Sequence, residues 1–212
     1  MKFYDCSPAP SPRRVRIFLR EKGIDVPIAQ VDLMKGEQLG EAFLRINPDG
    51  TVPVLELDDG TRLTEILAIC QYLEDTVPEP PLFGRDARER ALALMWNTKI
   101  EQQGLSALAD LFRNRSKGFK GRALPGPVGF DQIPALVERG RMRSEQFFDR
   151  VDGHLADSAF MIGDVFTLAD ITLLVGVDFA AWSKIAIGEK RRNLQRWYDE
   201  VSARPAVVDA GP

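Results

Sequence analysis

The sequence predicts a small mixed α/β domain followed by a larger all-helical domain. Within the first 80 residues, strand-like and helix-like runs alternate in the order β-α-β-α-β-β-α, which is typical of a small mixed sheet covered by helices. After the proline-rich segment at 78–81, strand patterns stop and only long helical periods follow. We therefore expect one domain at residues 1–78 and a second at 86–212.

The first domain is expected to hold a mixed four-stranded sheet. Its first helix should start at Ser11, because serine is a good N-cap and Pro12 fits the first helical position. Gly23 is placed to end that helix as its C-cap. The expected strands are 2–6, 28–33, 52–57 and 62–63, and the expected helices are 12–22, 37–46 and 64–76.

The second domain is expected to contain four helices. The clearest helix start is at Thr167, which forms a capping box with Asp170, while Phe166 and Ile171 are spaced as a hydrophobic staple. This helix is apolar nearly all round, so it should form the buried core of the domain. The expected helices are 86–115, 131–156, 167–183 and 190–203.

Composition restricts the partners. The formal net charge is −3, so there is no basic excess to hold a polyanion and we expect no nucleic-acid partner. No apolar run approaches the roughly 18–20 residues that a membrane-spanning helix needs. The first residues lack a signal-peptide pattern. We therefore expect a cytoplasmic protein that makes no membrane contact.

Few side chains are suited to metal or thiol chemistry. Cys6 and Cys70 both lie in apolar periodic segments, so we interpret them as buried, reduced thiols, with a nucleophilic Cys6 as the alternative. The chain has a single histidine, His154, which we interpret as a surface residue near a helix end. A site that needs two imidazoles is therefore excluded, and we expect neither zinc chemistry, nor a serine-protease triad built on this surface histidine, nor any other metal.

Four stretches, in order and at matching separations, resemble the cytosolic glutathione S-transferases. They are residues 14–24, 47–55, 63–73 and the capping box at 167–170. The resemblance covers nearly the whole chain. It implies a thioredoxin-like N-terminal domain that binds glutathione and an all-α C-terminal bundle that binds a small hydrophobic electrophile. It also implies a homodimer, and no cofactor besides glutathione as co-substrate.

The resemblance implies a glutathione-binding set in the first domain. Val52 would offer its backbone to the cysteinyl part of glutathione, next to a cis Pro53, although an ordinary trans proline opening a strand is the alternative. Glu65 would take the γ-glutamyl ammonium, or would only be a favourable charge in the first turn of its helix. The set is Lys35, Gln38, Thr51, Val52, Pro53, Glu65 and Ile66.

Three members of that set depart from a simple assignment. Ile66 stands where relatives have serine, so we expect glutathione to bind more weakly, by about 1 kcal/mol for one missing hydrogen bond. Lys35 and Gln38 would hold the glycyl carboxylate, with solvated surface as the alternative.

The group that activates the thiol is the open question. Ala9 occupies the position that holds serine in several classes of the family. Ser11 could place its hydroxyl on the sulfur, or could serve only as the N-cap of the helix. The backbone N–H groups of Arg13 and Arg14 at the positive helix end could also stabilise a thiolate. Tyr4 lies inside a strand, and we expect it to be packed.

Within the family, the chain looks most like a fungal and bacterial branch that lacks the usual catalytic Tyr, Ser or Cys. In that branch polar groups from the second domain help to activate the thiol, which makes Asn114 and Ser116 candidates. The stretches that carry this closer resemblance are 10–16, 31–37, 68–72, 95–97 and 111–114.

The electrophile should bind in an apolar pocket. Trp96, Ile100 and Phe112 are candidates, with core packing as the alternative for each. Nearby arginines could favour an anionic co-substrate, or form a solvated face; they are Arg113, Arg115 and Arg122. The predicted activity is conjugation of glutathione to small hydrophobic electrophiles, or reduction of peroxides. The alternatives are glutathione-dependent isomerisation or dehalogenation, and a non-catalytic binding or interaction protein on the same fold.

Overall fold

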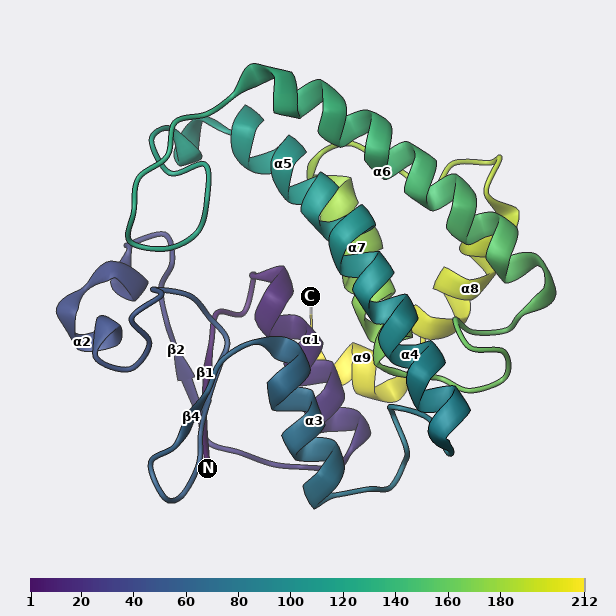
Figure 1. Ribbon diagram of the computed structural model, residues 1–212, viewed down its shortest axis with the longest axis horizontal. Coiled ribbons are helices and arrows are strands. Elements are labelled where there is room, and N and C mark those ends of the chain that lie inside the picture. The colour runs from purple at the N-terminus through teal and green to yellow at the C-terminus, as the bar shows by residue number, and fades with distance from the viewer. Residues whose placement is uncertain (212) are drawn as a thin grey trace. The chain divides into compact units, whose positions relative to one another are not determined.

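The computed structural model describes residues 1–211, which form two compact units (Figure 1). The first unit contains Met1–Pro80 together with residues 124–129 and 206–211. The second contains Pro81–Ala123 and Phe130–Pro205. Two segments that the sequence analysis assigned to the helical domain therefore pack in the first unit.

The first unit contains a four-stranded sheet in the order β2-β1-β3-β4. β1 pairs in parallel with β2 and antiparallel with β3, and β3 pairs antiparallel with β4, so the predicted mixed sheet is confirmed. The strands are β1 (Lys2–Asp5), β2 (Ile28–Gln30), β3 (Val54–Glu56) and β4 (Arg62–Leu63). The helices are α1 (Pro10–Glu21), α2 (Glu41–Leu44) and α3 (Ile66–Thr76), after a 3-10 turn at Glu37–Leu39.

Alternating side chains give each face of this sheet its own core. Tyr4 and Val54 are paired across β1 and β3 and pack with Phe43 of α2 on one face. Phe3 and Leu55, the next pair, are fully buried and point to the opposite face. α1 and α3 pack against each other in the same unit (Figure 1). Tyr4 is thus packed, as expected.

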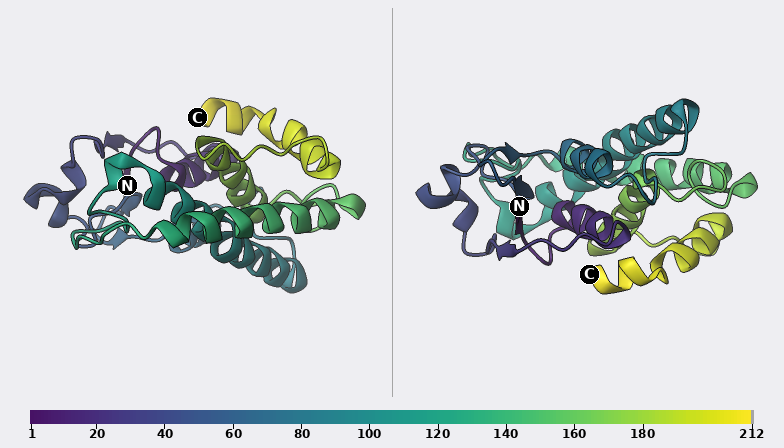
Figure 2. Two further views of the ribbon diagram at one scale, coloured as in Figure 1. Left: turned by 90° about the horizontal axis from the view of Figure 1, so that it is seen from above. Right: turned by 90° about the horizontal axis from the view of Figure 1, so that it is seen from below.

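The regular secondary structure described in the second unit is helical, apart from isolated bridges between its loops. The long helix predicted at 86–115 is present, but it is interrupted by a π-helical segment at Ile100–Leu105. Its second half, α5, runs beside α6, teal beside green in Figure 2. The helices are α4 (Ala87–Lys99), α5 (Ser106–Arg115), α6 (Pro134–His154), α7 (Leu168–Trp182) and α8 (Arg192–Ser202). A short helix that the sequence analysis missed, α9 (Pro205–Ala210), follows, and from residue 206 on it belongs to the first unit.

The capping box at the start of α7 is confirmed. Thr167 caps the helix, and Asp170 accepts hydrogen bonds from the Thr167 N–H and hydroxyl. The Asp170 carboxylate also accepts from the Met161 N–H and the Trp197 indole N–H, both at 2.9 Å. Asp170 is fully buried, so this carboxylate ties α7, α8 and the preceding loop together inside one core.

Burial gives Asp170 a testable pH signature. Desolvation raises its pKa from 3.8 to about 6, and the hydrogen bonds oppose that rise without cancelling it. The folded state therefore holds the proton more tightly than the unfolded state. We expect the resulting contribution to stability to be complete below pH 3.8 and to be lost as the pH rises to about 6.

Urea unfolding of wild type and Asp170→Asn across this pH range checks the expectation. The wild-type free energy of unfolding should fall relative to that of the variant by up to about 1.4 kcal/mol per pH unit. Parallel pH profiles for the two proteins would contradict it.

No helix within residues 1–211 is both long and apolar enough to cross a bilayer.

Candidate functional site

Strand topology brings the predicted glutathione residues of the first unit to one edge of the sheet. Tyr4 pairs with Val54 and Leu55 pairs with Leu63, so the end of β1, the start of β3 and the end of β4 lie side by side. Asp5 pairs with Gln30, which places the end of β2 at the same edge. The connections that leave this edge carry Ser11, Val52, Glu65 and Lys35.

The start of α1 differs from the expectation. The helix begins at Pro10 with Ala9 as its N-cap, so Ser11 lies in the first turn and is not the N-cap. The physical reason is that Pro10 also fits the first helical position and keeps Ala9 extended, at φ −84° and ψ 135°. Ser11 is therefore not used to cap the helix.

Ser11 is the one residue in this turn with two hydrogen-bond donors that have no acceptor among the described residues. Pro10 and Pro12 have no N–H, and the Arg13 N–H donates to the Ala9 carbonyl at 3.4 Å. Among residues 1–211, neither the N–H nor the hydroxyl of Ser11 has a hydrogen-bond partner. The turn thus presents two donors from a single residue at the positive end of a 12-residue helix.

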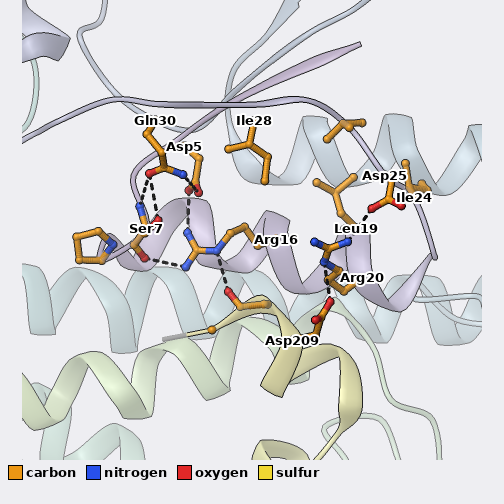
Figure 3. Close-up of a pocket in the computed structure, with 14 residues that line it drawn as sticks. Asp5, Ser7, Arg16, Leu19, Arg20, Ile24, Asp25, Ile28, Gln30 and Asp209 are labelled. Atoms are coloured by element: carbon orange, nitrogen blue, oxygen red, sulfur yellow. Dashed lines mark hydrogen bonds and ion pairs between the residues drawn. The ribbon is translucent and has the colours of Figure 1, made fainter.

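The loop before α1 is held by a buried ion pair. Arg16 donates to the Asp5 carboxylate at 2.7 Å and to the Ser7 carbonyl at 2.7 Å (Figure 3). Gln30 bridges Asp5 and Ser7 from the end of β2. Arg16 also donates to the Ala210 carbonyl, so the C-terminal segment closes this network. These groups line a cavity of about 490 Å³.

A second connection carries Thr51, Val52 and Pro53. The buried Asn47 amide donates to the Thr51 carbonyl at 2.9 Å and to its hydroxyl at 3.0 Å, which fixes the loop before β3. The Val52–Pro53 bond is cis, as the resemblance implied. The Val52 N–H and C=O make no hydrogen bond to another described residue, so both are available to an extended peptide.

The third connection places Glu65 at the start of α3. Glu65 is the N-cap, with φ 60° and ψ 124°, and so it does not lie in the first helical turn as expected. A glutamate at positive φ is uncommon and is a reason to suspect a functional constraint. Its exposed carboxylate has no ion pair among the described residues. Ile66 is buried, so at that position only the backbone N–H faces the helix end.

Lys35 and Gln38 follow β2 in different environments. Lys35 is exposed and forms an ion pair with Asp32 at 3.2 Å. Gln38 is half-buried, and its Oε1 accepts no hydrogen bond from another described residue. A buried amide oxygen without a donor is costly, so Gln38 is the better placed of the two to gain from a bound polar ligand.

Two of the candidates for the electrophile pocket are core residues of the helical unit. Trp96 is 8% exposed and stacks on His154, with ring centroids 4.2 Å apart. Ile100 is 1% exposed. His154 also hydrogen-bonds the Met161 carbonyl, so it is a packed helix-end residue and not the surface residue expected. Both thiols, Cys6 and Cys70, are buried, as expected, and neither forms a disulfide within residues 1–211.

The two polar candidates at the end of α5 differ in whether their side chains are hydrogen-bonded. The Asn114 amide donates to the Asp110 carbonyl and accepts from the Ile133 N–H, both at 2.8 Å, so its side chain joins α5 to the start of α6. The Ser116 hydroxyl has no partner among the described residues. Phe112 is half-buried within a group of four aromatic rings.

Sequence reasoning missed two members of that aromatic group. Phe179 and Trp182 lie on α7, and each contacts Phe112. Their spacing of three residues on one helix face was the available signal, but nothing in the sequence places that face against α5.

Comparison with known proteins agrees with this arrangement. The model of the glutathione S-transferase N-terminal domain matches residues 9–76, and that of the C-terminal domain matches residues 124–205. Glutathione S-transferase 2 of Saccharomyces cerevisiae is 35% identical, covering 98% of this chain and 88% of that protein. Maleylacetoacetate isomerase of Pseudomonas aeruginosa is 30% identical, covering 100% of this chain and 96% of that protein.

A solved structure gives the same result in three dimensions. The crystal structure of a glutathione S-transferase domain-containing protein from Marinobacter aquaeolei VT8 superimposes with a TM-score of 0.89 at 37% identity. It covers 98% of this chain and 100% of that one. By sequence along almost its whole length and by fold, the chain belongs to the glutathione S-transferase family.

Proposed function

We propose that the protein activates the thiol of glutathione for attack on small hydrophobic electrophiles, with Ser11 as the activating residue. The observation that carries the proposal is the pair of unpartnered donors on Ser11, at the positive end of α1 and at the sheet edge where Val52 and Glu65 also lie. A free thiol with a pKa of about 8.5 is only a few per cent ionised at pH 7. Donors aimed at the sulfur favour the thiolate.

The remaining residues of the set would orient glutathione. The Val52 N–H and C=O pair with the cysteinyl backbone, as one strand pairs with another. The Glu65 carboxylate takes the γ-glutamyl ammonium, and the first N–H groups of α3 take the neighbouring carboxylate. Gln38 and Lys35 hold the glycyl end. The thiolate then attacks the electrophilic carbon, and the leaving group departs with its electron pair.

The branch of the family follows from the same position. The Ala9 side chain has no hydrogen-bond donor for the sulfur. Ser11, two positions later, takes over the role that a serine at the Ala9 position has in several classes. We assign the chain on this ground to the branch that lacks the usual catalytic Tyr, Ser or Cys. Of the two polar candidates from the helical unit, Asn114 and Ser116, only the Ser116 side chain makes no hydrogen bond to another described residue, so its hydroxyl could assist.

Ser11→Ala should raise the pKa of bound glutathione. We expect kcat/KM to fall about 10-fold at pH 6.5, since a hydrogen bond to a charged group is lost. The loss should shrink above pH 8.5, where the thiol ionises unaided. Thiolate absorbance near 240 nm in the glutathione complex, titrated across this range, measures the shift directly.

Two further variants make the experiment decisive. Ser11→Thr keeps the hydroxyl and should restore much of the ionisation, while Ser202→Ala removes a hydroxyl from α8 and should change nothing. If Ser11→Ala ionises bound glutathione as wild type does, the role passes to backbone N–H groups or to the helical unit. Failure of the wild type to bind glutathione would favour a non-catalytic interaction protein instead.

A second candidate activity has two observations in its favour. A relative 30% identical is named maleylacetoacetate isomerase, and the helical unit carries several cations suited to an acidic substrate. Glutathione-dependent isomerisation of a dienoic acid is therefore the alternative to conjugation.

We further infer that the protein acts in the cytoplasm as a two-fold homodimer, which is the commonest oligomer of soluble proteins.

A further inference from the structure

The helical unit carries a cluster of cations without acidic partners. Five basic residues lie between positions 113 and 122, and no Asp or Glu occurs from 111 to 130. The nearest acidic residue in sequence, Asp110, faces Arg139 on α6 at 3.5 Å. Within residues 1–211, none of the five forms an ion pair. They are Arg113, Arg115, Lys117, Lys120 and Arg122.

The arginines of this cluster are fixed by neutral acceptors. Arg113 donates to the carbonyls of Ala123 and Arg122, both at 2.8 Å. Arg122 donates to the Gly118 carbonyl at 3.3 Å. Burial and the nearby positive Arg122 together lower the pKa of Arg113. The loop is therefore held in place while its positive charge stays uncompensated, in a chain whose net charge is −3.

The same surface holds a group of aromatic rings. Phe112 contacts Phe119 at 5.4 Å, Phe179 at 5.4 Å and Trp182 at 5.5 Å between ring centroids. These distances are those of well-packed aromatic pairs. Trp182, the last residue of α7, is nevertheless 47% exposed. A large ring left this open at the edge of an aromatic group is a surface for another planar group.

Direct contacts join the cations to the rings. The Arg113 guanidinium lies 4.3 Å from the centre of the Phe119 ring. The Arg115 side chain donates to the Trp182 carbonyl at 3.3 Å, across from α5 to α7. Positive charge and exposed aromatic surface therefore form a single patch within one unit, which we call the cation–aromatic cluster: Phe112, Arg113, Arg115, Phe119, Arg122 and Trp182.

We propose that the cation–aromatic cluster binds the second substrate and selects electrophiles in which a planar conjugated group carries a carboxylate or another anion. The ring of such a molecule stacks on Trp182 and its neighbours, and Arg115 and Arg122 take the anion. This proposal rests on the transferase function proposed above, and it adds the class of the second substrate.

Two matched electrophiles test the selection. 1-Chloro-2,4-dinitrobenzene is neutral, and 4-chloro-3,5-dinitrobenzoate carries a carboxylate on a similar ring. In both, the glutathione sulfur bonds to the ring carbon that bears chlorine, chloride leaves with its electron pair, and the thiol proton goes to solvent. We expect Arg115→Gln/Arg122→Gln to lower kcat/KM for the benzoate about 10-fold and to change that for the neutral compound less than about twofold.

A control separates the cluster from the general field of the protein. Arg88→Gln removes an exposed cation from α4 in the same unit and should leave the ratio of the two kcat/KM values unchanged. Added salt should reduce the preference for the benzoate, because screening weakens exposed charges. Equal losses on both electrophiles, or an equal effect of Arg88→Gln, would overturn the proposal.

Calorimetry gives a readout that needs no turnover. 3,5-Dinitrobenzoate lacks the leaving group, and 1,3-dinitrobenzene lacks the charge as well. Wild type should bind the benzoate more tightly, and the double glutamine variant should lose that difference while keeping its circular dichroism spectrum. If the protein fails to bind glutathione, the proposed function fails, but this titration still decides whether the cluster selects anions.

Discussion

Replacing Arg16 by methionine should lower the free energy of unfolding by about 3–5 kcal/mol, which is the usual effect of breaking a buried ion pair. The Arg16 side chain is 9% exposed and that of its partner Asp5 is 1% exposed. Methionine fills similar space but leaves the Asp5 carboxylate buried beside no cation. The carbonyls of Ser7 and Ala210 lose a donor in the same step.

Arg20 provides a matched control one turn further along α1. Its guanidinium is 40% exposed and pairs with Asp25 and Asp209, which are 92% and 66% exposed. Solvent screens both pairs, so Arg20→Met should cost no more than about 1 kcal/mol. Urea unfolding followed by circular dichroism measures both variants. Similar losses would show that the burial of the Arg16 pair carries no special weight.

The double variant Asp5→Asn/Arg16→Met tests the cause. It removes the Asp5 carboxylate, which Arg16→Met leaves buried without a cation, as well as the Arg16 guanidinium. The double variant should therefore be more stable than Arg16→Met alone. The same network holds Ser7, four residues before Ser11. Arg16→Met should therefore also weaken glutathione binding at temperatures where the variant is still folded, whereas Arg20→Met should not.

Local sequence signals predicted the features whose causes are local. The capping box at Thr167 is correct because the two residues that satisfy each other lie within one turn. The start of α1 was wrong because two residues, Ala9 and Ser11, each precede a proline, and the better side-chain cap was not the one used. That error matters, because it frees the Ser11 hydroxyl for the proposed role.

Features that depend on packing were not predictable from the sequence. Asn114 was chosen for its polarity, but its amide is bonded to both α5 and the start of α6. Trp96 was chosen for its place on a long helix, but the ring faces His154 within the same unit. The meeting of Phe112 on α5 with Trp182 on α7 likewise arises only when distant segments come together.

The close approach of α5 and α6 makes Gly140 a sensitive position in the helical unit. A Cβ at residue 140 would lie 2.6 Å from the Ala107 carbonyl oxygen and 2.8 Å from the Leu111 nitrogen. Both are backbone atoms, so relief requires that the two helices move apart. We expect Gly140→Ala to lower the free energy of unfolding by about 3 kcal/mol, at the upper end of overpacking effects.

Substitutions at two other glycines provide comparisons for this prediction. A Cβ at Gly104, in the π-helical segment, would meet the Phe147 ring at 2.7 Å, and a side chain can shift, so Gly104→Ala should cost less than Gly140→Ala. Gly153 lies on α6 with nothing within 4 Å of its Cβ position. Gly153→Ala should therefore stabilise the protein by about 0.5–1 kcal/mol through helix propensity alone.

Unfolding followed by tryptophan fluorescence measures all three, because Trp96 and Trp197 are buried in this unit. The expected order of stability is Gly153→Ala, wild type, Gly104→Ala, Gly140→Ala. Propensity alone would make all three alanines stabilising, since each replaces a helical glycine. Destabilisation at residues 104 and 140 would thus report contact with a neighbouring group, and the larger loss at residue 140 would be specific to backbone contact between α5 and α6. The distance between the Cβ position of residue 140 and the Ala107 carbonyl oxygen is 2.6 Å. A stabilised Gly140→Ala would mean that α5 and α6 are further apart than this distance implies.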